Sequence, residues 1–173
     1  VIEKGEPKSC NIVTSCEGKG KTFIMFSDDL DKALATFVLA NGAAATGQKV
    51  TIFFTFWGLN VIKKLHKPNV EKDIFGKMFG MMLPSSSRKL KLSKMSMGGI
   101  GGKMMRYIMN RKGIDSLESL RQQALENGVE FIACQMSMDV MGVKQEELLD
   151  EVTIGGVATY MERADNANIN LFI

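Results

Sequence analysis

The chain has few of the residues that build disulfide-rich or metal-binding folds. Among 173 residues there are three cysteines, three prolines, one histidine and one tryptophan. Three cysteines are an odd number and too few for a disulfide framework. Cys10 and Cys16 are separated by five residues and lack further ligands nearby, so they do not predict a metal site. We therefore expect a reducing, cytoplasmic location, no metal and no cofactor.

The sequence also lacks long hydrophobic runs. No run approaches the roughly 18 apolar residues of a spanning helix. The first ten residues contain Glu3, Lys4, Glu6 and Lys8 and no apolar core, which is not the pattern of a secretory signal. The content of 45% hydrophobic and 24% charged residues is ordinary for a globular protein. The pattern predicts a polar arm or linker at residues 1–20 and a single domain at residues 21–173.

Methionine is abundant, and charge is unevenly distributed. Of 13 methionines, eight fall within residues 78–109. Residues 88–112 contain eight basic and no acidic side chains, whereas residues 113–151 contain nine acidic and two basic ones. This asymmetry predicts an interacting surface, or two faces of an oligomer.

The pattern of apolar residues predicts an α/β fold. Helical spacing over residues 28–46 separates the first two apolar runs and indicates a βαβ unit with a parallel sheet. We predict a three-layer, flavodoxin-like domain with a five-stranded, mainly parallel sheet. The five strands are predicted at residues 21–27, 49–55, 129–133, 152–154 and 169–173.

A long, Met-rich insertion, residues 57–113, separates the second and third predicted strands. Short helices are predicted at residues 56–65, 71–82 and 103–112, with a glycine- and serine-rich loop at residues 85–102. An insertion of this length is often functional. Residues 116–127 then give the clearest amphipathic helix pattern, which ends before Gly128.

Cys134 is the leading candidate for chemistry. It follows a buried strand, at the edge where open parallel sheets place their ligand crevices. A helix that starts just beyond it would direct N–H groups at the sulfur and favour the reactive thiolate. A buried structural cysteine is the alternative, because free cysteine packs as a small hydrophobe. His66 is distant in sequence, so sulfur relay or redox chemistry fits better than hydrolysis. Cys10 and Cys16 are interpreted as exposed thiols, with a resolving role for Cys134 as the alternative.

Two acidic residues follow the first predicted strand. Asp28 and Asp29 would lie at the same sheet edge as Cys134 and would repel the phosphate of a flavin. We favour a role in capping the following helix over a role in chemistry.

The Met/Gly/Lys segment within the insertion has several interpretations. A lid over Cys134 or a subunit contact ranks first, a basic membrane-surface helix at residues 103–112 second, and nucleic-acid binding last, because Tyr107 is the only aromatic residue there. Residues assigned to substrate binding or the lid are Lys94, Met95, Met97, Gly98, Gly99, Met136 and Asp139.

Residues 133–142, with the sequence ACQMSMDVMG, resemble a hallmark of the DsrE/DsrF-like family. Residues 92–99, 155–160 and 169–173 fit the same subgroup, which is described as DsrE-like sulfur-relay or peroxiredoxin-like. The resemblance covers residues 21–173. It implies a flavodoxin-like sheet, a homo-oligomer and sulfur carried as a persulfide on Cys134. It also implies rhodanese-like or TusA-like partners. This chain departs from the family pattern in having no second cysteine close to Cys134.

Three hypotheses for function follow. The first is a sulfur carrier or sulfurtransferase that works through Cys134. The second is a non-enzymatic oligomeric or membrane-peripheral module that uses the basic segment at residues 88–112. The third, a thiol peroxidase, ranks lowest because no hydroxyl and arginine set is evident near Cys134 in the sequence.

Overall fold

The computed structural model describes residues 20–65, 78, 83–94 and 99–173. The predicted arm at residues 1–20 and the predicted helix at residues 71–82 therefore lie almost entirely outside the described residues. His66, Cys10 and Cys16 also lie outside them.

Five strands form one parallel sheet in the order β4-β3-β2-β1-β5. The strands are β1 (Gly20–Met25), β2 (Val50–Phe54), β3 (Glu130–Cys134), β4 (Thr153–Gly155) and β5 (Ala167–Phe172). The predicted α/β class and five-stranded parallel sheet are confirmed. The strand order is not the 2-1-3-4-5 of flavodoxin. The chain adds β2, β3 and β4 successively on one side of β1, and then returns to place β5 on the other side.

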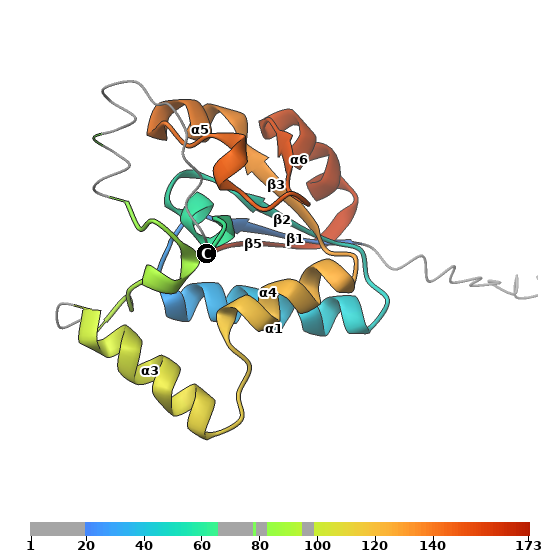
Figure 1. Ribbon diagram of the computed structural model, residues 1–173. Coiled ribbons are helices and arrows are strands. Elements are labelled where there is room, and N and C mark those ends of the chain that lie inside the picture. Colours follow the sequence, from blue (N-terminus) through green and yellow to red (C-terminus); the bar gives the residue numbers. More distant parts are fainter. Residues whose placement is uncertain (1–19, 66–77, 79–82, 95–98) are drawn as a thin grey trace, which may run out of the picture.

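Helices cover both faces of the sheet (Figure 1). Helices α1 (Leu30–Ala45) and α4 (Leu117–Glu126) pack side by side on one face, and α3 (Ile100–Arg111) lies outside them. Helix α6 (Val157–Asp165) covers the other face, and α5 (Gln135–Met141) follows β3 directly. Three short 3₁₀ turns complete the described chain: η1 (Phe56–Ile62), η2 (Ser87–Lys89) and η4 (Gln145–Glu147).

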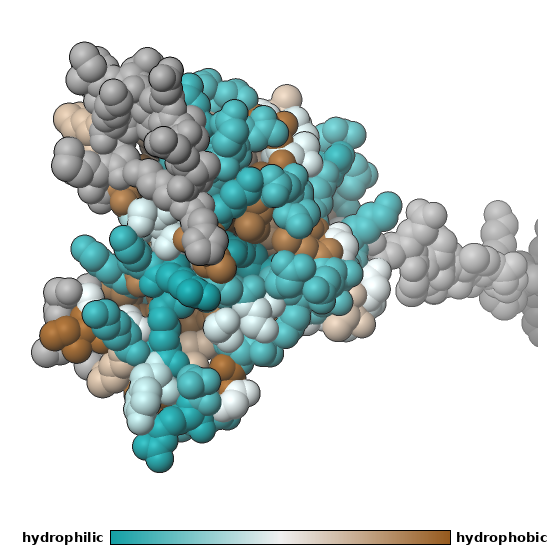
Figure 2. Space-filling view, in the orientation of Figure 1, coloured by the Kyte–Doolittle hydropathy of each residue, from teal (hydrophilic) through white to brown (hydrophobic). Residues whose placement is uncertain are grey.

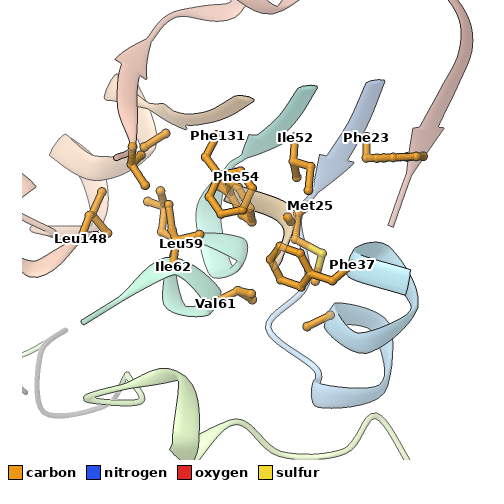
Figure 3. Packing of buried hydrophobic residues seen from close by; sticks show 14 of the residues in the cluster. Phe23, Met25, Phe37, Ile52, Phe54, Leu59, Val61, Ile62, Phe131 and Leu148 are labelled. Carbon is orange, nitrogen blue, oxygen red and sulfur yellow. The ribbon is translucent and has the colours of Figure 1, made fainter. Parts of the chain in front are cut away.

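The main core lies between the sheet and the α1–α4 layer (Figure 3). Phe54 and Phe131 pack edge to face at 5.4 Å between ring centroids, and Phe37 of α1 packs against both. Helix α5 joins this core through Met138 and Met141. Successive strand residues point to opposite faces, so Ile132 and Cys134 belong to a second, smaller cluster under α6.

Glycines in the insertion have a packing role that the sequence pattern did not reveal. The predicted loop at residues 85–102 contains η2 and the first turn of α3, so the predicted start of that helix at residue 103 is corrected to Ile100. A Cβ atom at Gly102 would lie 3.3 Å from the carbonyl oxygen of Leu90. Gly102 therefore permits close packing within a helix, whereas its sequence context resembles a loop.

Candidate functional site

Cys134 is the last residue of β3, and its side chain is buried, with 1% exposed. It packs with Phe53, Ile132 and Tyr160, which form the small cluster beneath α6. Phe53 and Tyr160 stack at 5.2 Å between ring centroids and form the apolar side of this cluster. The thiol therefore lies at the carboxyl edge of the sheet, as predicted, but inside the protein.

The side chain of Cys134 belongs to the cluster that includes Tyr160 of α6. Cys134 is also the N-cap residue of α5, and its sulfur makes no capping hydrogen bond with that helix. Helix α5 reaches the main core through Met138 and Met141. The influence of the α5 amides on the thiol stays a prediction.

The start of α6 lies next to Cys134. Gly155 of β4 pairs with Cys134 across the ladder, and Gly156 is the N-cap of α6 without a side-chain cap. A Cβ atom at Gly155 would lie 2.9 Å from Ile132 and 3.4 Å from the Thr159 hydroxyl oxygen, so this corner is tightly packed. The first amides of a helix carry partial positive charge and lack intrahelical partners. Helix α6 thus begins two residues after the ladder partner of Cys134.

A buried pair of hydroxyls lies at the same edge of the sheet. Thr55 follows β2 directly, and the β2–β3 register extended by one residue brings it alongside Cys134. The hydroxyl oxygens of Thr55 and Ser137 are 2.8 Å apart, and both residues are buried. Sequence reasoning missed this pair, because Thr55 and Ser137 are 82 positions apart. The sequence did contain a signal for this pair: both residues lie at or just after the end of a predicted parallel strand, and the carboxyl ends of parallel strands lie at one edge of the sheet.

The outer face of α5 carries the other predicted site residues of this region. Met136 and Asp139 are exposed, as is Val140. Asp139 accepts a hydrogen bond of 2.9 Å from the side chain of Gln135. These residues are adjacent to Cys134 in the chain, but they lie on the surface while the thiol is inside.

The described part of the predicted lid lies near the start of α1. Lys94 is exposed and follows Ser93, whose amide donates a 2.9 Å hydrogen bond to Asp31. Gly99 is the N-cap of α3 and has a left-handed φ of 96°. Met95, Met97 and Gly98 lie outside the described residues. The hydrogen bond from Ser93 to Asp31 thus connects this segment with α1, and its role as a lid stays a prediction.

The two acids after β1 do not cap α1 in the predicted way. Asp29 occupies the N-cap position, but its carboxylate accepts from the Ser27 hydroxyl at 2.8 Å and pairs with Lys32 at 2.8 Å. Asp28 turns inward and accepts a 3.0 Å hydrogen bond from Asn60. Burial raises the pKa of Asp28, and this outweighs the opposing hydrogen bond from Asn60.

The described residues contain neither a metal-binding cluster of side chains nor a membrane-spanning helix. No group of three or more histidine, cysteine, aspartate or glutamate side chains is placed to hold a metal ion in residues 20–65, 78, 83–94 and 99–173. Over these same residues, no helix has the length and apolar character needed to cross a bilayer.

A cysteine at the carboxyl edge of an all-parallel α/β sheet is the defining feature of this site. Residues 18–172 match the DsrE/DsrF/DrsH-like family, and the protein belongs to that family. YrkE of Bacillus subtilis (strain 168) is 44% identical over 155 residues, which cover 90% of this chain and 97% of YrkE. The sulfur carrier protein DsrE2 of Allochromatium vinosum is 38% identical over 161 residues, covering 91% and 99% of the two chains.

A solved structure is similar in fold. The crystal structure of the ychN protein from E. coli aligns with a TM-score of 0.53 and covers 89% of this chain and 99% of that one. The two sequences are 11% identical, so this likeness concerns the fold alone.

Proposed function

We propose that this protein is a sulfur carrier that accepts sulfane sulfur on Cys134 as a persulfide and transfers it to a partner thiol. The observation that carries the proposal is the position of Cys134, at the carboxyl end of β3 and beside the first turn of α6. The membership of this chain in the DsrE/DsrF/DrsH-like family, and its likeness to a protein named as a sulfur carrier, support the same function.

The transfer needs only thiol exchange chemistry. The Cys134 thiolate attacks the outer sulfur of a donor persulfide, a new S–S bond forms, and the donor cysteine leaves as a thiolate with the electron pair of the broken bond. An acceptor thiolate then attacks the outer sulfur on Cys134, which leaves as a thiolate in turn. The start of α6, next to Gly155, would stabilise the negative charge of the bound persulfide.

Burial of Cys134 has a chemical advantage in a carrier. Phe53, Ile132 and Tyr160 shield the sulfur, so a loaded persulfide would be protected from solution thiols until a partner displaces the covering side chains. Rhodanese-like or TusA-like proteins are the proposed donors and acceptors. This predicts that small polysulfides load Cys134 slowly and that a protein donor loads it faster.

Intact-mass spectrometry after incubation with polysulfide, or with thiosulfate and a rhodanese, tests the assignment. We expect a gain of one sulfur atom that reductant removes and that maps to Cys134. The Cys10→Ser/Cys16→Ser double variant, which removes the two other thiols, should keep this gain. Adding Cys134→Ser or Cys134→Ala to the double variant should abolish it. Cys134→Ala controls for the cost of burying a hydroxyl in place of the thiol, about 1–3 kcal/mol. A folded double variant that is not loaded at Cys134 would refute the proposal.

A further inference from the structure

Helix α3 presents apolar side chains to solvent instead of to the core. Ile100, Met104 and Ile108 follow one another at a spacing of four residues, and Tyr107 lies beside them. These four side chains are between 40% and 65% exposed. A helix packed on a globular protein normally buries its apolar stripe, so the orientation of α3 requires an explanation.

The opposite side of α3 makes the contacts with the rest of the protein. Gly101, Gly102 and Met109 are its buried residues. Arg106 donates to the carbonyl oxygen of Ser87 at 3.0 Å and pairs with Glu118 at 3.4 Å. These contacts fix α3 with its apolar row outward, and the helix projects beyond the α1–α4 layer (Figure 1).

Basic residues flank the outward apolar row. Lys103, Arg111 and Lys112 on and just after α3 are exposed. Residues 88–112 contain no acidic residue, and Lys89, Lys91 and Lys94 are also exposed. Hydrophilic and hydrophobic side chains lie close together over the projecting part of the molecule at the lower left of Figure 2.

We propose that α3 is a membrane-surface helix that binds bilayers containing anionic lipid. The apolar row would enter the boundary between headgroups and acyl chains, and the flanking lysines and arginines would contact lipid phosphates. The helix would lie in the plane of the bilayer surface, because its 12 residues span only about 18 Å.

The charge pattern favours a lipid surface over a protein partner. A protein interface combines charges of both signs in its polar rim, whereas an anionic bilayer selects against every acidic residue facing it. The apolar row is also convex, so it fits a deformable surface without needing a matching groove. A second copy of the chain is the competing occupant and is an outcome of the test below.

Flotation of the full chain with vesicles tests the proposal. We expect the protein to float with vesicles of phosphatidylcholine and phosphatidylglycerol in roughly equal amounts, and not with phosphatidylcholine alone. Binding should weaken as salt rises, because salt screens charge at the surface. The Lys103→Gln/Arg111→Gln/Lys112→Gln variant should partition roughly a hundredfold less.

Apolar variants and a matched control complete the design. Met104→Gln/Ile108→Gln should also lose flotation, whereas Val38→Gln/Met161→Gln, which alters equally exposed residues on α1 and α6, should keep it. Thermal unfolding of each variant checks that the fold is retained. Equal binding to neutral and anionic vesicles, or no effect of the α3 variants, would overturn the proposal. An α3 variant that changes only the oligomer mass would assign this face to a second copy instead.

Discussion

At the scale of single residues, Asp28 is an unusual acid because it turns into the protein at the edge where the strand order reverses. Burial raises its pKa, and the neighbouring charge of Asp29 adds to this effect. The hydrogen bond from Asn60 and the positive charge of Lys63 oppose it. The side-chain oxygen of Asn60 is buried without a hydrogen-bond partner among the described residues. The folded protein therefore binds a proton at Asp28 more readily than the unfolded chain does.

The raised pKa gives a pH-dependent prediction for Asp28→Asn. The free-energy penalty for a charged Asp28 in the folded protein is absent below the pKa of the unfolded state, about 3.9. It grows as pH rises through the higher pKa of the folded state. The variant should therefore be more stable than the parent at neutral pH. The difference should shrink toward zero in acid. Urea unfolding between acid and neutral pH measures it. A variant that is less stable at neutral pH would show that the carboxylate is favoured by Lys63.

At the scale of elements, the turn η1 passes directly over β1 at Gly58. The amide of Gly58 donates to the carbonyl oxygen of Phe26 at 2.8 Å. A Cβ atom added at Gly58 would lie 1.9 Å from the carbonyl oxygen of Met25. Only glycine fits at this contact, which positions η1 and the hydroxyl of Thr55 just before it.

Two glycine-to-alanine substitutions should have opposite effects on stability. Gly58→Ala should lower the free energy of unfolding by about 1–3 kcal/mol or more, since backbone must move to relieve the overlap. Gly42→Ala, in α1 with open space around it, should raise it by about 0.5–1 kcal/mol through helix propensity. Urea unfolding of both variants makes the comparison. A stable Gly58→Ala variant would mean that η1 can shift without loss.

The elements were largely predictable from sequence, but their arrangement was not. Hydrophobic runs and helical spacing located the five strands and α1, and placed Cys134 at a strand end. The same local patterns contain no information on strand order, so β5 was not expected beside β1. They also do not say which helix covers which face, so the packing of Cys134 with Tyr160 of α6 was not expected. The Gly101-Gly102 pair was misread because loop glycines and close-packing glycines look alike in sequence.

At the scale of the whole molecule, one edge of the sheet is exposed. Among the described residues, strand β5 pairs with β1 alone, and most residues of β5 are exposed. Ile169 and Leu171 are 43% and 39% exposed, and Phe172 is 68% exposed although it packs near Phe26. An apolar edge strand is a ready surface for association with another chain. The homo-oligomer implied by the family resemblance is proposed to use this edge.

Charged substitutions on β5 test the proposed assembly. Ile169→Lys/Leu171→Lys should convert an oligomer to monomer, because each lysine would be desolvated in the contact. Light scattering after size exclusion measures the mass, and Met161→Lys on the outer face of α6 is the matched control. A parent chain that is monomeric would refute the assembly, and a double variant that keeps the oligomer mass of the parent would place the contact elsewhere.

The position of β5 beside β1 also bears on how the chain folds. The side chains of Lys21 and Asn168, which face each other across these two strands, are 147 residues apart in sequence. Pairings of such long range carry a large loop-closure entropy and slow the folding of a domain. During synthesis β1 emerges early, and the edge that β5 will occupy stays open until nearly all of the described chain has left the ribosome. Until β5 is in place, the open edge of β1 is a site where a nascent chain can associate with another chain.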